Sequence, residues 1–196
     1  MNITADQIKV LRDKTGVSIM QCRKALEEAQ GDMDKAVILL RKKSTELAAK
    51  KGDRTFGAGT VASYIHSNGT VGTMVELVSE TDFVSGNDEF KALARDIAMH
   101  IAASNPQFLK KDDVSEEEKK KLIEVFTDEV KDKPEAMRPK IVEGKLSAYL
   151  AEKSLIDQPF IKNPEITIGG LIENAIQKFG EKIEVARFAR FKVLEK

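Results

Sequence analysis

The sequence predicts an α+β protein, in which three short helices precede an antiparallel sheet with further helices beside it. Helix caps and glycine stops divide the first forty residues, and an Asn-Gly turn joins two runs rich in β-branched residues. Strands and helices also form separate groups along the chain, which favours an antiparallel sheet over an alternating α/β fold. We therefore expect a three-helix module with its linker over residues 1–54 and an α+β core domain over residues 55–196.

The caps of the amino-terminal helices indicate where two of them begin. Thr4 with Gln7 and Ser18 with Gln21 have the spacing of capping boxes, and a glycine at position 16 suits the left-handed residue that ends a helix. The second helix has apolar residues at the i, i+3, i+4 and i+7 positions of one face, namely Cys22, Ala25, Leu26 and Ala29. Three helices of this size form a small bundle. The charged residues 41–54 are expected to fray into a linker.

The core domain is expected to begin with a hairpin. Runs over residues 60–65 and 71–78 flank Ser67–Thr70, which contains the Asn-Gly pair. A loop over residues 80–86 follows, and Asn87 caps the next helix. The remaining expected elements are a helix from Ser115, a helix over residues 142–153 after interruptions at Pro134 and Pro139, an edge strand at 158–161, a helix over 171–179 and a final strand over 183–193.

The composition excludes some classes of partner. Thirty-two Lys and Arg residues balance thirty-two Asp and Glu residues, so no net field attracts nucleic acid or an anionic membrane. Cys22 is the only cysteine, which is typical of a reducing compartment. No apolar run reaches the roughly 18 residues that span a bilayer, and the first residues do not resemble a secretory signal. We expect a cytoplasmic protein, or one in an organelle matrix after removal of a targeting segment, that binds neither nucleic acid nor membrane directly.

No catalytic site is visible in the sequence. Residues 57–62 match the weak GxGxxA form of the dinucleotide fingerprint, but they lead into a strand where the fingerprint requires a helix. We interpret these glycines as a flexible start to the hairpin. Asp96 stands four residues before His100, a spacing that permits a shared metal ion, yet one pair is below the usual ligand count. His66 and His100 are more simply interpreted as histidines that are solvated or lie at the edge of the core.

Two features suggest a binding surface. Helical periodicity places Met20 opposite the apolar face of the second helix and next to Arg23, where a flexible apolar side chain suits an adaptable contact. The alternative is that Met20 folds over the first helix or touches the core domain. The segment Thr81–Val84 (TDFV) lies between a strand end and a helix cap. Composition alone makes Phe83 a core residue, but an aromatic residue and an acid presented by rigid elements also suit insertion into a partner.

Residues 11–26, LRDKTGVSIMQCRKAL, resemble the first signature of the elongation factor Ts family, and residues 76–85, ELVSETDFVS, resemble the second. The similarity continues through residues 98–102, 157–160 and 187–191, so it covers nearly the whole chain. The resemblance implies a guanine-nucleotide exchange factor for the translational GTPase elongation factor Tu, with no cofactor and no enzymatic reaction of its own. It also implies that the amino-terminal helices resemble a ubiquitin-associated (UBA) domain.

The resemblance implies two sets of contact residues, which are carried over by position. The amino-terminal module grips a helix in the nucleotide domain of elongation factor Tu, and its contacts fall on Arg12, Ile19, Met20 and Arg23. A loop associated with dislodging the Mg²⁺ held with the nucleotide falls on Thr81, Asp82, Phe83 and Val84.

The chain departs from the family pattern in places. Val78 stands where Asn is usual, and Gly86 stands where a basic or amide residue is common. The first departure bears on how the TDFV loop is anchored, and the second bears on how the loop approaches the partner. The chain resembles the short family form, in which two copies supply two core halves, and it is expected to lack the coiled-coil module of longer members. Ala189 stands where some short members carry a cysteine that joins the subunits. We therefore expect a noncovalent homodimer, for which the open edge of a three-stranded sheet is suited.

Two other functions remain as alternatives. A ubiquitin-like or nascent-chain binding module accounts for the amino-terminal helices but leaves the TDFV loop and the core domain unexplained. The hypothesis of an enzyme with an unrecognised site is supported only by Asp96, His100 and scattered carboxylates. Release of labelled GDP from elongation factor Tu, with and without this protein, separates these possibilities.

Overall fold

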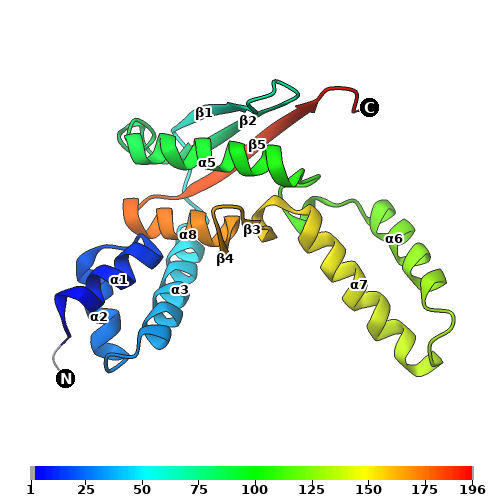
Figure 1. Cartoon of the computed structure of the whole chain (residues 1–196), viewed down its shortest axis with the longest axis horizontal. Coiled ribbons are helices and arrows are strands. Elements are labelled where there is room, and N and C mark those ends of the chain that lie inside the picture. Colours follow the sequence, from blue (N-terminus) through cyan, green and yellow to red (C-terminus); the bar gives the residue numbers. More distant parts are fainter. Residues whose placement is uncertain (1–2, 196) are drawn as a thin grey trace.

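The computed structural model describes residues 3–195 and confirms an α+β fold with a small antiparallel sheet (Figure 1). The helices are α1 (Ala5–Thr15), α2 (Ile19–Glu28), α3 (Met33–Lys50), α4 (Asp82–Ser85), α5 (Asp88–Ser104), α6 (Glu116–Glu129), α7 (Arg138–Lys153) and α8 (Ile168–Phe179). The strands are β1 (Ala58–Ile65), β2 (Val71–Ser79), β3 (Pro159–Phe160), β4 (Asn163–Thr167) and β5 (Ile183–Lys192). Short 3₁₀ turns lie at Lys111–Asp113, Glu135–Met137 and Leu155–Asp157. None of the described helices has both the length and the hydrophobicity needed to cross a membrane.

Helices α1, α2 and α3 form a bundle around a core of their own (Figure 1). Thr4 completes the predicted capping box with Gln7 at the start of α1, and Gly16 ends that helix with a φ of 70°. The Ser18 hydroxyl caps α2 by accepting a hydrogen bond from Gln21 N at 3.4 Å, and it donates to Gln21 Oε1 at 3.0 Å. The buried apolar residues of the bundle are Leu11, Val17, Cys22, Ala25, Leu26, Ala29, Ala36 and Leu40.

The prediction that residues 41–54 fray into a linker is wrong, because α3 continues through most of this segment. The second half of α3 packs against α8, where the buried hydroxyl of Ser44 donates a hydrogen bond to the buried side chain of Gln177. Leu47 and Ala48 pack against the larger apolar core, which the sheet, α5 and α8 form. The charged residues of this segment therefore belong to the solvent side of a helix that tertiary contacts stabilise.

Strand β2 is the centre of the sheet, and it pairs with β1 and β5 in antiparallel orientation. The predicted Asn-Gly hairpin joins β1 to β2, with Gly69 at a φ of 68° and Asn68 Oδ1 accepting from Thr70 N at 3.1 Å. Helix α5 covers one face of the sheet, and α8 runs below α5 in the view of Figure 1. The buried residues of this larger core include Leu77, Phe90, Ile97, Ile101, Leu155, Ile168 and Ile183.

The glycines of the weak dinucleotide fingerprint serve close packing, which corrects their interpretation as a flexible segment. Strand β1 begins at Ala58, so the fingerprint lies mostly within a strand. A Cβ at Gly57 would lie 2.7 Å from the carbonyl oxygen of Glu80, and one at Gly59 would lie 2.8 Å from that of Leu77. Glycine is required at both positions because β1 and the backbone beside it approach too closely for a side chain.

A two-helix arm formed by α6 and α7 projects from the core domain (Figure 1). Phe126 of α6 meets Tyr149 of α7 edge to face, with ring centroids 6.1 Å apart. Two packed helices do not by themselves form the coiled-coil module of longer family members, so the expectation that the chain lacks that module stays a prediction. Pro139 does not interrupt the chain but lies in the first turn of α7, where a backbone N–H would have no helical partner.

His100 is fully buried in the core, where the sequence predicted a solvated histidine or one at the edge of the core. Its Nε2 lies 2.9 Å from Gln158 Oε1. Asp96, the suggested second metal ligand, instead forms an ion pair with Lys162 at 2.7 Å. Across residues 3–195, no group of three or more His, Cys, Asp or Glu side chains is placed to hold a metal ion.

The burial of His100 predicts a pH dependence of stability. Burial lowers the pKa of His100, and the hydrogen bond with Gln158 opposes this shift only in part. The unfolded chain therefore takes up a proton near pH 6.5, while the folded protein does so only at lower pH. We expect the free energy of unfolding to fall below about pH 6.5, by up to about 1.4 kcal/mol per pH unit from this residue.

Urea unfolding at several pH values measures this dependence. His100→Gln keeps a nitrogen donor facing Gln158 but does not titrate, so its stability should fall less steeply with decreasing pH. Identical pH profiles for the wild type and the variant would contradict the prediction.

Candidate functional site

The connection between β2 and α5 contains the predicted TDFV segment. It forms a single helical turn, α4, where an irregular loop was predicted. Val84 is 4% exposed and belongs to the core, whereas Phe83 is 85% exposed. Successive residues of a helix point about 100° apart, so the turn that buries Val84 directs Phe83 toward solvent. The interpretation of Phe83 as a core residue is therefore wrong.

Hydrogen bonds tie both ends of this turn to its surroundings. Ser79 Oγ donates to the carbonyl oxygen of Thr81 at 3.0 Å. Thr81 N and Thr81 Oγ1 donate to the two carboxylate oxygens of Glu181, at 3.0 Å and 2.6 Å. At the other end, Asn87 N donates to the carbonyl oxygen of Val84 at 3.1 Å, and Asn87 Oδ1 accepts from Glu89 N at 2.8 Å and caps α5. The exposed ring of Phe83 is thus carried by a backbone that is held on both sides.

The two departures from the family pattern lie on either side of the turn. Gly86 N donates to the carbonyl oxygen of Asp82 at 2.8 Å, and a Cβ at Gly86 would come within 2.9 Å of that oxygen. A larger residue would require the turn to shift, so glycine permits a tight end to α4. Val78 pairs with Gly59 of β1 and with Glu184 of β5 in the middle of the sheet. Its place is therefore in the strand and not in the turn.

Glu80 links the start of the turn to the segment that follows α3. Its carboxylate accepts hydrogen bonds from Arg54 at 2.9 Å and from Lys182 N at 2.5 Å. Burial opposes ionisation of this carboxyl, but the bonds from Lys182 and Arg54 outweigh it, so the pKa of Glu80 lies below its ordinary value. A charged and well-held carboxylate therefore immediately precedes Thr81.

The four residues predicted on the amino-terminal module are all exposed: they are Arg12, Ile19, Met20 and Arg23. Ile19 is 57% exposed and Met20 67% exposed, so the first turn of α2 presents two apolar side chains to solvent. Arg23 follows one turn later and pairs with Glu27 at 2.9 Å. The alternative in which Met20 folds over the first helix is not what the structure shows. We refer to these four residues as the amino-terminal surface.

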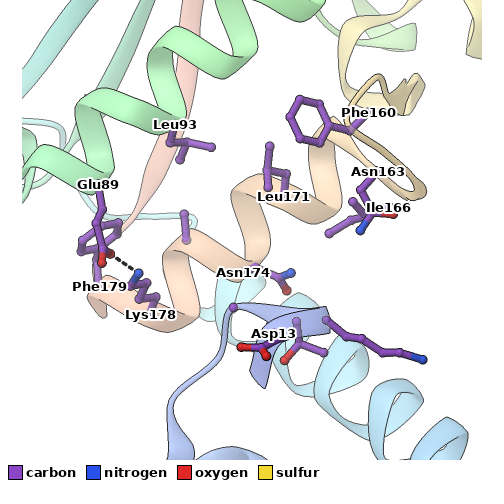
Figure 2. Close-up of a pocket in the computed structure, with 14 residues that line it drawn as sticks. Asp13, Glu89, Leu93, Phe160, Asn163, Ile166, Leu171, Asn174, Lys178 and Phe179 are labelled. Atoms are coloured by element: carbon purple, nitrogen blue, oxygen red, sulfur yellow. Dashed lines mark ion pairs between the residues drawn. The ribbon is translucent and has the colours of Figure 1, made fainter. Parts of the chain in front are cut away.

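A cavity of about 300 Å³ lies between the bundle and the core domain (Figure 2). Its rim includes the ion pair of Glu89 with Lys178, and Asp13 of α1 lies across from it (Figure 2). The apolar residues that line it are Leu93, Phe160, Ile166, Leu171, Ala175 and Phe179. The end of α1, which leads to the amino-terminal surface, and the start of α5, which follows the TDFV turn, both border this cavity.

Sequence reasoning missed Glu181 and Glu80 as supports of the turn, and it missed the cavity. Glu181 is 100 residues away from Thr81, and acidic residues are common in this chain. No local spacing distinguishes an anchoring carboxylate from a solvated one, so only the fold identifies these residues.

The family model described as Elongation factor TS matches residues 46–195, which is more than half of the chain. The chain belongs to the elongation factor Ts family. It is similar to elongation factor Ts of Koribacter versatilis, with 49% identity over 195 residues that cover 98% of this chain and 89% of the relative. It is 49% identical over 194 residues to that of Thermodesulfovibrio yellowstonii (98% and 97% covered). It is 46% identical over 195 residues to that of Thermosipho melanesiensis (98% and 100% covered).

These matches confirm the family resemblance and make the chain a member of a family of translation elongation factors. The matched region of the family model contains the TDFV turn and Glu181. The elongation factor Ts relatives align over almost the whole chain, so the similarity includes the amino-terminal bundle as well.

The exposure of Phe83 predicts that its ring contributes little to folding. Phe83→Ala should change the free energy of unfolding by less than about 0.5 kcal/mol. Phe90 is a matched control, since it is fully buried and meets Phe179 edge to face, and Phe90→Ala should cost about 3–5 kcal/mol. Guanidinium unfolding followed by circular dichroism measures both values. A comparable loss of stability in both variants would show that the Phe83 ring is buried in solution.

Proposed function

We propose that this protein is a guanine-nucleotide exchange factor, which binds elongation factor Tu in its GDP form and promotes release of GDP. The observation that carries the proposal is the exposed ring of Phe83, held by fixed neighbours in a member of the elongation factor Ts family. A large aromatic side chain that folding leaves in water can be buried by a partner. We place the activity in the cytoplasm, because translation elongation takes place there.

The proposed mechanism is thermodynamic coupling between two binding sites of the GTPase, without an enzymatic reaction by the factor. A factor that binds the nucleotide-free GTPase more tightly than the GDP form must lower the affinity for GDP by the same ratio. Burial of the Phe83 ring in the partner contributes about 2–3 kcal/mol. This contribution favours exchange if the receiving pocket opens only when the contacts to Mg²⁺ and phosphate have shifted.

The other residues of the TDFV turn have distinct proposed roles. Asp82 is exposed beside Phe83, and its carboxylate accepts a charge-assisted hydrogen bond from a group that the ring displaces. Val84 is buried and Thr81 is bonded to Glu181, so these two residues hold the turn. Insertion of Asp82 and Phe83 thus displaces Mg²⁺ and weakens the contacts to the nucleotide.

We propose that the bundle is a UBA-like module that binds a helix in the nucleotide domain of elongation factor Tu. Ile19 and Met20 supply exposed apolar contact area, and a methionine adapts readily to the surface it meets. Arg12 and Arg23 place cations beside these side chains. This contact adds affinity without depending on the nucleotide, and it brings the TDFV turn to the nucleotide site.

The division into residues 1–54 and 55–196 remains part of this proposal. Each unit has its own apolar core, which supports two structural units. The second half of α3, however, packs on α8, so the boundary does not separate two freely moving bodies.

The two surfaces predict different kinetic effects. Phe83→Ala should lower the maximal rate of stimulated GDP release by at least about tenfold. Met20→Ala should raise the concentration of factor that gives half-maximal stimulation and leave the maximal rate nearly unchanged. Release of fluorescent GDP from purified elongation factor Tu, measured over a range of factor concentrations, gives both quantities.

Ile123→Ala is the control for this experiment, because Ile123 is an exposed apolar residue of the α6–α7 arm. It should behave as the wild type. If the wild-type protein does not accelerate GDP release, the proposed function is wrong.

We further propose a noncovalent homodimer that forms through the sheet. The face of the sheet opposite α5 carries exposed apolar side chains from all three strands, namely Val61, Ile65, Met74 and Phe191. Ile65, Gly72 and Phe191 align across the three strands, and Met74 pairs with Ala189, the position expected for a linking cysteine. Contiguous apolar patches are uncommon on monomers, and a two-fold axis brings the same patch of two subunits together. The face, more than the open strand edge, therefore supports this contact.

A charge on this face should separate the subunits. Met74→Glu is expected to raise the dissociation constant of the dimer by about 100-fold or more, because it buries an unpaired carboxylate. Sedimentation equilibrium over a range of protein concentrations measures the constant. Val125→Glu, on an exposed position of α6, is the control and should not change it. A wild-type protein that is monomeric at all concentrations would contradict the proposal.

A further inference from the structure

The turn between α8 and β5 contacts three other segments through three consecutive residues. The carbonyl oxygen of Gly180 accepts a hydrogen bond from Lys51 Nζ at 2.5 Å, at the end of α3. Lys182 N donates to Glu80 Oε1 at 2.5 Å, and Lys182 Nζ donates to the carbonyl oxygen of Gly52 at 2.6 Å. This turn is therefore fixed both to the end of the bundle and to the end of β2.

Glu181 lies between these two anchors and faces the TDFV turn. Both of its carboxylate oxygens accept hydrogen bonds from Thr81, one from the backbone N–H at 3.0 Å and one from the hydroxyl at 2.6 Å. Bidentate contact with one residue restrains both position and orientation, more than a single bond does. Because Gly180 and Lys182 are tied down on either side, Glu181 forms a fixed support.

Helix α4 depends on this support because it has little stability of its own. It consists of four residues, and no side chain caps its first turn. Thr81 occupies the N-cap position, where a threonine hydroxyl usually accepts from the backbone of the helix; here the hydroxyl donates to Glu181 instead. A single helical turn gains too few hydrogen bonds to offset its nucleation cost. The orientation of α4 is therefore set by residues outside it.

We propose that Glu181 is a positioning residue for nucleotide exchange, which holds Thr81 so that α4 presents the Phe83 ring at a fixed place and angle. Phe83 is two residues after Thr81 and on the same turn, so movement of Thr81 moves the ring. The inference rests on the proposed exchange function and assigns a role in it to a residue outside the TDFV segment. Glu181 itself does not need to touch the GTPase.

Two substitutions at one position separate positioning from general stability. Glu181→Met keeps a side chain of similar length but removes both acceptors. Glu181→Gln keeps an oxygen that accepts from Thr81 N, and its amide nitrogen donates to Thr81 Oγ1, which can also act as an acceptor. The glutamine variant therefore retains both contacts, and only the methionine variant releases the turn.

Labelled-GDP release from elongation factor Tu should show this difference in the maximal rate. Glu181→Met is expected to lower the maximal stimulated rate about tenfold, because misplacement of a contacting group by about 1 Å costs up to about 100-fold. The half-saturating concentration should stay within about twofold of the wild type, since the amino-terminal surface is unchanged. Glu181→Gln should restore the maximal rate to within about twofold of the wild type.

The double variant Phe83→Ala with Glu181→Met tests whether Glu181 acts through the ring. The maximal rate of GDP release that it stimulates should be no lower than the rate with Phe83→Ala alone. The reason is that a misplaced ring and an absent ring have the same effect. Additive losses would show that Glu181 acts elsewhere. A methionine variant with the wild-type rate, or a glutamine variant as slow as the methionine variant, would also overturn the inference.

Amide hydrogen exchange of the free protein provides a readout that does not require the GTPase. The amides of Thr81, Ser85 and Gly86 should exchange about tenfold faster in Glu181→Met than in the wild type or in Glu181→Gln, while amides of α5 remain unchanged. If the hydrogen-exchange rates of these three amides do not change, Glu181 does not position α4, even if the protein is confirmed as a nucleotide exchange factor. If the wild-type protein does not accelerate GDP release from elongation factor Tu but these amides respond as expected, the proposed function is wrong. The anchoring role of Glu181 then still stands.

Discussion

The packing of α3 against α8 is the contact on which the arrangement of both candidate surfaces depends. Leu40 of α3 lies in the core of the bundle, and one turn later Ser44 and Thr45 bond to Gln177 and Glu173 of α8. One helix therefore belongs to two cores, and separating them would expose buried side chains from both. The amino-terminal surface and the TDFV turn are consequently parts of one frame, which supports the proposal that both contact one partner at the same time.

The TDFV turn leaves the ring of Phe83 in water, which forgoes stabilisation of the fold, and buries the neighbouring Val84, which anchors the turn. Leaving the Phe83 ring in water forgoes about 1.5–3 kcal/mol of burial, while Val84 and Ser85 are buried and fix the same turn to the core. Sites that trade stability for function are expected where binding occurs. Because the ring already stands on a held backbone, little conformational entropy is lost when a partner buries it.

The two exposed apolar regions differ in a way that matches their proposed uses. Phe83 is a single ring on a short turn, which suits the brief contact that we propose for nucleotide exchange. The open face of the sheet extends over three strands, from Val61 and Ile65 on β1 to Phe191 on β5. The same face also carries the ion pair of Glu76 with Arg187. A broad contact that combines apolar side chains with such a pair is proposed to support lasting association between subunits. The molecule thus carries a small and a broad exposed apolar region on different parts of the larger core, which supports the proposals of a transient and a lasting contact.

The sequence by itself determined the features whose signals are local. Thr4 with Gln7, the Asn-Gly hairpin and Asn87 each act within a few residues, so the α+β order, most helix starts and the place of the TDFV segment could be predicted. Only the tertiary structure decided that α3 continues past residue 41, that Phe83 faces solvent while Val84 is buried, and that Glu181 holds Thr81. Each of these depends on packing or on a hydrogen-bond partner far away in the chain, and a pattern of neighbouring residues carries no information about such partners.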